Sequence, residues 1–164
     1  MRRPPRAAGA RALCAAWVLP WGVHAAGGSD TPAWNASSKG DDAALKPAKA
    51  SLAAGDYVAA QAQLKTALAA DPGSADLNNL YAYALRKGPN PDMALVFKHY
   101  EDALRIDPKH RGAHEYIGEA YLMVGNPAKA KEHLAALDKL CLFSCEEYDM
   151  LKKAVASYDA KAPK

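Results

Sequence analysis

The stretch that decides the fold occurs twice. Leu68-Ala69-Ala70-Asp71-Pro72 returns as Leu104-Arg105-Ile106-Asp107-Pro108, 36 positions later. A second echo links Gly55-Asp56-Tyr57 to Gly125-Asn126-Pro127. Proline cannot continue a helix and pushes the residue before it out of the helical region, so each Asp-Pro marks a helix end. A period in the mid-thirties, carried by helical segments, indicates repeated helix-turn-helix units.

Helical periodicity covers most of the chain after the first quarter. No segment shows the period-two alternation or the β-branched runs of a strand. Recurring small residues would let paired helices approach closely, while Tyr and Leu fill the space between them. The sequence therefore predicts an all-α fold, and we expect helices over residues 44–54, 57–70, 75–87, 91–106, 111–124, 127–141 and 145–160.

These units resemble tetratricopeptide repeats. The third unit matches the family signature at Ile117, Gly118, Tyr121, Gly125 and Ala130, and departs from it at Leu137, where the family has alanine. The first unit matches at Gly55, Tyr57, Ala60, Leu64, Ala67 and Pro72. The second matches at Tyr100, Ala103 and Pro108, with two extra residues in its turn. The resemblance covers about residues 41–141.

The resemblance implies a short right-handed helical solenoid in residues 43–160. Its three repeats would occupy residues 43–74, 75–110 and 111–143. The last repeat of a solenoid exposes an apolar face unless another element covers it. We therefore interpret residues 145–160 as a capping helix, with Leu151, Val155 and Tyr158 on the covered side.

Residues 1–25 have the layout of a secretory signal peptide. Four arginines and no acid come first, followed by an apolar run over residues 12–23 and a small-residue exit. That run is too short for a stable membrane anchor, which takes about 20 residues. Residues 26–42 lack an apolar period and predict a flexible linker. We expect an exported protein, periplasmic or secreted, with no membrane attachment after cleavage.

The charge balance argues against nucleic acid as a partner. The whole chain has 21 Lys+Arg and 18 Asp+Glu. Residues 1–25 hold four of the arginines and no acid, which leaves 17 basic and 18 acidic residues, a net charge of −1. The chain after residue 25 therefore lacks the basic excess on which nucleic-acid binding depends.

The family binds extended or helical peptides on a concave face that the first helix of each repeat lines. Carried over position by position, the groove would comprise Lys49, Asp76, Asn79, Tyr83, Arg86, Lys87, Glu115, Glu119, Leu122 and Met123. The resemblance thus implies a protein-binding or peptide-binding module without catalysis or cofactor. Alternatively, the groove is filled by the chain's own linker or by a second copy.

The sequence contains no enzyme signature. It has no glycine-rich phosphate loop, no His-Glu-x-x-His and no nucleophile elbow. Glu115 and Glu119 lie four apart on one helical face. With no second polar cluster beside them, we interpret this pair as an exposed acidic strip rather than as catalytic carboxylates.

Cys141 and Cys145 are the only cysteines after residue 25. Ser144 and Glu147 form a Ser-x-x-Glu capping box, which predicts a new helix with Cys145 in its first turn. The cysteines would then flank a helix corner, where an oxidising compartment favours a disulfide. One alternative is a pair of free structural thiols. The other is a copper, zinc or thiol-redox centre that combines both cysteines with His110 or His114.

Overall fold

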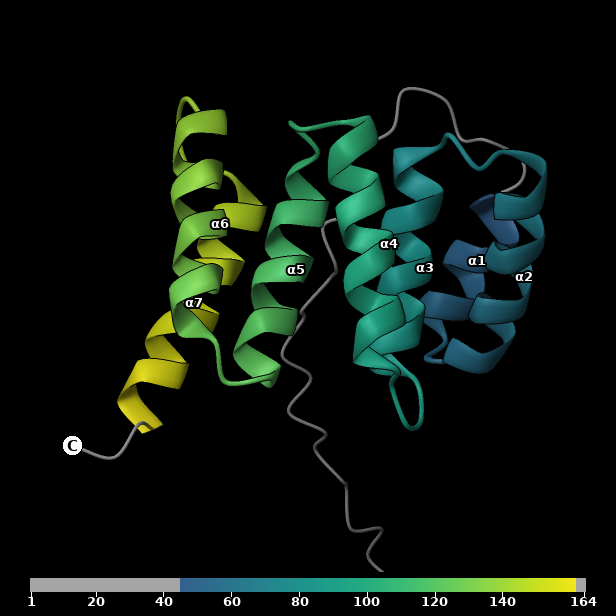
Figure 1. Cartoon of the computed structure of the whole chain (residues 1–164), viewed down its shortest axis with the longest axis horizontal. Helices are drawn as coiled ribbons and strands as arrows, with labels where there is room; N and C mark the ends of the chain where they lie inside the picture. Colours follow the sequence, from purple (N-terminus) through teal and green to yellow (C-terminus); the bar gives the residue numbers. More distant parts are fainter. Residues whose placement is uncertain (1–44, 162–164) are drawn as a thin grey trace, which may run out of the picture. The chain divides into compact units, whose positions relative to one another are not determined.

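The computed structural model describes residues 45–161, and all regular structure in this range is helical. Its helices are α1 (Leu45–Ala53), α2 (Tyr57–Ala70), α3 (Ala75–Lys87), α4 (Met93–Ile106), α5 (Arg111–Met123), α6 (Pro127–Leu140) and α7 (Glu146–Lys161) (Figure 1). The all-α prediction is confirmed, and each predicted boundary lies within two residues of the observed one. The predicted signal peptide (residues 1–25) and linker (residues 26–42) lie outside the described residues.

Short polar side chains begin and end the helices. Asp56, Ser74 and Asp92 each accept hydrogen bonds from backbone N–H groups in the first turn of α2, α3 and α4. Because Asp92 is the capping residue and lies outside the helix, α4 begins two residues later than predicted. Asp71 and Asp107 end α2 and α4 directly before a proline, as the repeated Asp-Pro motif predicts.

The turn inside each of the three helix pairs contains one residue with left-handed backbone. Gly55 (φ 74°) joins α1 to α2, and Gly125 (φ 76°) joins α5 to α6. Glycine suits these positions because it has no Cβ to clash. In the longer turn between α3 and α4, Asn90 adopts this conformation instead (φ 52°). Asparagine tolerates it better than most side chains.

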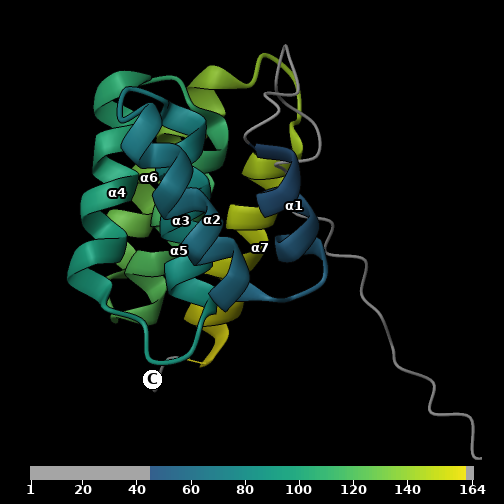
Figure 2. The ribbon, with the colours of Figure 1, turned by 90° about the vertical axis from the view of Figure 1, so that its right-hand side faces the viewer.

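Helices α1 to α6 pack mainly on their neighbours along the chain. Within pairs, α1 contacts α2, α3 contacts α4 and α5 contacts α6. Between pairs, α2 contacts α3 and α4 contacts α5, and the final helix α7 contacts both α5 and α6 (Figure 1 and Figure 2). Alanines without any exposed surface allow the close approach, among them Ala60, Ala84, Ala103 and Ala120. The fold is therefore built from helix pairs added one after another.

The buried residues form two clusters. The larger one spans α1 to α5 and includes Leu64, Leu77, Val96, Tyr100 and Ile117. The smaller one joins Ala130 and Leu137 of α6 to Leu151 and Val155 of α7. Tyr121 of α5 packs against both clusters.

The predicted capping box at the start of α7 is wrong. Ser144 Oγ donates a hydrogen bond to Asp149 Oδ2 at 2.5 Å, and Glu147 Oε1 lies 3.6 Å from Arg111 Nε of α5. Because Glu147 is buried, a cationic partner on α5 stabilises it better than a neutral backbone amide would. The helix begins at Glu146, so Cys145 precedes it.

The buried side of α7 is the predicted one. Leu151 and Val155 are buried, and Leu151 lies against Gly118 of α5. A Cβ on Gly118 would come within 2.6 Å of Leu151 Cδ2, so the glycine is what lets the two helices approach. No helix in residues 45–161 is long and apolar enough to span a membrane.

Candidate functional site

Helices α3 and α5 lie side by side and run in the same direction. Near their N-terminal ends, His110 Nε2 contacts Asp76 Oδ1 at 3.0 Å. Near their C-terminal ends, Arg86 Nη2 contacts Glu119 Oε2 at 2.7 Å. Because these contacts join N-terminal end to N-terminal end and C-terminal end to C-terminal end, side chains of both helices lie on one common surface. This α3–α5 face contains the predicted groove residues Asp76, Asn79, Tyr83, Arg86, Lys87, Glu115, Glu119 and Met123. The predicted groove residue Leu122 packs instead against the buried cluster of α6 and α7.

Burial divides these predicted groove residues into two groups. Lys87 and Met123 are exposed, while Asp76, Glu119, Leu122 and also Lys49 of α1 are partly buried. Four are buried, with exposed fractions of 3% for Asn79, 7% for Tyr83, 6% for Arg86 and 2% for Glu115. The four buried side chains therefore support the face without being accessible to a partner. The exposed and partly buried side chains are the ones that a partner could contact.

Arg86 is the centre of a buried polar cluster. Its Nε donates a hydrogen bond to Tyr100 Oη at 3.3 Å, and its guanidinium lies 5.5 Å from the Tyr83 ring centroid and 5.8 Å from that of Tyr116. Burial acts to lower the pKa of Arg86, but Tyr100 and Glu119 raise it by more, so the side chain keeps its charge. The ion pair, the hydroxyl and the ring faces together compensate for the lost hydration.

Glu115 is not part of an exposed acidic strip, and that prediction is wrong. Its side chain is buried, and Oε2 has no hydrogen-bond partner. Burial, followed by the nearby Glu119 and Glu147 carboxylates, raises the pKa of Glu115 to about 9. The side chain is therefore protonated at neutral pH. Helical spacing predicts which side of α5 Glu115 occupies, but it does not predict that neighbouring helices bury the side chain.

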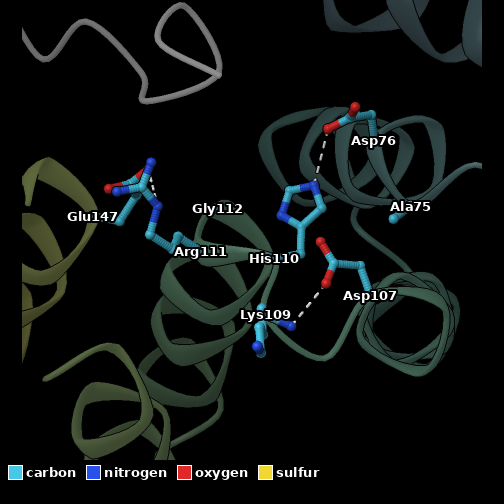
Figure 3. Close-up of a pocket in the computed structure, with 8 residues that line it drawn as sticks. All are labelled: Ala75, Asp76, Asp107, Lys109, His110, Arg111, Gly112 and Glu147. Carbon is cyan, nitrogen blue, oxygen red and sulfur yellow. Dashed lines mark hydrogen bonds and ion pairs between the residues drawn. The ribbon is translucent and has the colours of Figure 1, made fainter. Parts of the chain in front are cut away.

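A polar pocket of ≈ 260 Å³ lies at the N-terminal end of the α3–α5 face (Figure 3). His110 caps α5, and its Nδ1 accepts a hydrogen bond from Ala113 N at 3.0 Å. The proton is therefore on Nε2, which donates to Asp76 across the pocket. The lining residues are Ala75, Asp76, Asp107, Lys109, His110, Arg111, Gly112 and Glu147.

Acidic and basic side chains lie close together in this pocket. Asp107 Oδ1 accepts from Lys109 N at 2.9 Å, and Glu147 is paired with Arg111. Three carboxylates thus line the pocket together with two cations and a histidine. Such a pocket suits a polar segment that carries both donors and acceptors, rather than a strongly charged ligand.

Sequence reasoning missed three residues of this region. Tyr100 was predicted only as a repeat-signature position and Glu147 only as a capping residue, and Tyr116 was not predicted. The basic run Lys109-His110-Arg111 at the start of α5 was an available signal. Cations are unfavourable next to the positive end of a helix dipole, so a basic run there indicates acidic neighbours or a ligand.

The cysteine pair forms the predicted disulfide. Cys141 and Cys145 are joined, with Cα atoms 5.8 Å apart, across the corner between α6 and α7. The bond leaves no thiolate there to ligate a metal. The histidines of the alternative metal centre lie elsewhere: His110 contacts Asp76, and His114 faces His133 of α6. Within residues 45–161, no three His, Cys, Asp or Glu side chains gather in a metal-binding arrangement.

Comparison with protein-family models and with curated proteins finds no match to this chain.

Proposed function

We propose that this chain is an exported protein-interaction module that binds a peptide or protein segment on the α3–α5 face, without chemistry of its own. The observation that carries the proposal is the alignment of α3 with α5, from the Asp76–His110 contact to the Arg86–Glu119 ion pair. This alignment brings polar groups of two helices onto one continuous surface, which is the arrangement that a linear ligand needs.

The packing order supports a tetratricopeptide-like interpretation. Three helix pairs follow one another, and α7 covers the apolar side of the last pair. We infer a short right-handed solenoid with repeats at residues 43–74, 75–110 and 111–143, capped by α7. Export rests on the sequence of residues 1–25 alone.

The dimensions of the α3–α5 face limit what binds there. From Asp76 to Lys87 the face extends about 16 Å along α3, at roughly 1.5 Å per residue. An extended segment of about five residues spans this length. One end of the face offers the polar pocket at His110, and the other offers exposed Lys87 and Met123. A segment with a polar end and an apolar end fits this order.

Photo-crosslinking tests the proposal directly. A photoreactive amino acid at Lys87 or Met123 should link the protein to the same polypeptide in cells, because both positions are exposed on the face. The same group at Lys65 of α2 or Lys129 of α6, which are also exposed but lie outside the face, should not. Linkage from Lys65 and Lys129 but not from Lys87 and Met123 would contradict the proposal.

A further inference from the structure

The most exposed large apolar side chains of residues 45–161 lie next to each other in the corner between α6 and α7. Leu142 is 90% exposed and Phe143 is 88% exposed, whereas Val58, the next in order, is 62% exposed. Single apolar side chains are common on protein surfaces, but two adjacent ones that are almost fully open to solvent indicate a contact surface.

The disulfide closes the loop that carries this pair. Cys141 and Cys145 are joined with their Cα atoms 5.8 Å apart, so the residues between them form a tight loop. Helix α6 ends directly before this loop and α7 begins directly after it, so both ends of the loop are held. A loop constrained in this way loses little conformational freedom on binding, which favours association.

Charged side chains of both signs lie beside the apolar pair. A hollow of ≈ 430 Å³ is lined by Asp138, Cys141, Leu142, Phe143, Ser144, Tyr148, Asp149 and Lys152. The exposed carboxylate of Asp138 has no ion pair or hydrogen bond in residues 45–161. The Lys152 ammonium lies 5.3 Å from the Tyr148 ring centroid and pairs with no carboxylate in the same range. An anion and a cation of this surface therefore have no oppositely charged partner within their own chain's described part.

We propose that this loop and the charged residues beside it form a weak, twofold-symmetric contact between two copies of the chain. In a twofold contact the same surface of each copy meets itself, so the two copies exchange identical contacts. Leu142 and Phe143 of one copy pack against the same two residues of the other. Asp138 of each copy lies opposite Lys152 of the other, so both charges gain a partner.

The composition of the surface favours a second copy over a membrane. An apolar centre with charged groups of both signs around it is typical of a protein–protein contact. Asp138, Glu146 and Asp149 are exposed near the loop and would repel the anionic headgroups of a bilayer. The surface shares no residue with the α3–α5 face, so this contact leaves that face open.

The area of the apolar pair limits the strength of the contact. A large apolar side chain buries at most about 250 Å², so the four that two copies contribute bury at most about 1,000 Å². A stable protein–protein interface buries roughly 1,200 Å² or more. We therefore expect a dimer that forms at high protein concentration and exchanges with the monomer.

Sedimentation equilibrium of the full chain tests the contact. The average mass should rise from that of a monomer toward twice that value between about 10 μM and about 1 mM protein. Phe143→Ser should weaken the association by about tenfold or more, because it removes an apolar side chain from each copy. Val58→Ser of α2 also replaces an exposed apolar side chain, and as the matched control it should leave the association unchanged.

A mixing experiment tests whether Asp138 and Lys152 meet across two copies. Asp138→Lys and Lys152→Asp each bring like charges together in a pair of identical copies, so either variant alone should associate about threefold or more weakly. A mixture of the two variants has opposite charges at both contacts and should associate as the wild type does. If mixing restored nothing, the proposed arrangement of the two copies would be wrong.

Two further results would overturn the proposal: a monomer at every concentration, or association that Phe143→Ser leaves unchanged. Binding of a monomer to phosphatidylglycerol vesicles that Phe143→Ser abolishes would assign the loop to a membrane instead. The substituted side chains are all exposed, so the fold should be retained, and circular dichroism of each variant checks this. Crosslinking from the α3–α5 face is independent of all these results, so the two proposals can fail separately.

Discussion

Arg86 and Glu115 lie on the same face and are both buried, yet Arg86 is ionised and Glu115 is neutral. Arg86 is buried with Glu119, Tyr100 and two ring faces around its guanidinium, and it remains charged. Glu115 is buried with Glu119 and Glu147 nearby and an unpartnered oxygen, so its proton is retained. Burial disfavours the ionised form of any side chain, and the neighbouring charges and hydrogen bonds determine whether the group stays ionised.

The raised pKa of Glu115 makes stability depend on pH. Its pKa is about 9 in the folded protein, above the ordinary value of 4.5 for a glutamate. Between these values the folded state binds more protons than the unfolded state, so the free energy of unfolding falls as pH rises, by up to about 1.4 kcal/mol per pH unit. Glu115→Gln mimics the protonated form and should remove this dependence. The variant should therefore be more stable than the wild type at pH 8–9.

Urea unfolding between pH 5 and pH 9 measures the difference. Glu101→Gln, on the exposed side of α4, is the control and should leave the wild-type slope intact. If wild type and Glu115→Gln have parallel profiles over this range, Glu115 is not the buried acid described above.

At the scale of helices, α5 and α7 meet at Gly118. Gly118→Ala places a methyl group 2.6 Å from Leu151 Cδ2, and Leu151 has no exposed surface into which to move. Alanine is the better helix former by about 1 kcal/mol, but overpacking costs roughly 1–3 kcal/mol. We expect a net loss in the free energy of unfolding. The loss should shrink when Leu151→Ala is combined with it.

Gly73→Ala is the control for this double-mutant cycle. The Cβ added there meets only Asp71 Oδ1 at an ordinary 3.6 Å, so stability should barely change. If Gly118→Ala had the same effect in the wild type as in the Leu151→Ala variant, the two side chains would not touch.

The disulfide acts on the corner between α6 and α7. A bond that closes so short a loop stabilises by about 2 kcal/mol through the entropy of the unfolded chain. Replacing Cys141 and Cys145 together by serine should lower the free energy of unfolding by about that amount. A reducing agent should have the same effect on the wild type and none on the double variant. Peptide mass analysis of unreduced protein should show the two cysteines linked.

Local chemistry explains what the sequence predicted well at this scale. Asp-Pro pairs and polar caps act within a few residues, so helix boundaries were predicted to within two positions. The failures involve distant partners. Glu147 had the spacing of a capping box, but Arg111 of α5 binds it instead. Likewise, the position of Asn79, Tyr83, Arg86 and Glu115 on one face was predictable, whereas their burial depends on helices far along the chain.

At the scale of the whole described region, the two buried clusters differ in size. Fifteen buried residues make up the cluster of α1 to α5, against four in the cluster of α6 and α7. Because α6 and α7 contact mainly α5 and each other, these two helices can separate without breaking the packing between α2, α3 and α4. Such arrays open in parts rather than all at once.

Hydrogen exchange should therefore show lower opening free energies for amides in the interior of α6 and α7 than for those in α3 and α4. The small cluster has little apolar area to lose, and Gly118, Tyr121 and Leu122 of α5 pack against it. Gly118→Ala should lower protection further in α6 and α7 and leave α3 and α4 unchanged, which separates local opening from global destabilisation. Equal opening free energies in all helices would contradict separate opening of α6 and α7. That result would mean that the two clusters, which both contact Tyr121, unfold as one cooperative unit.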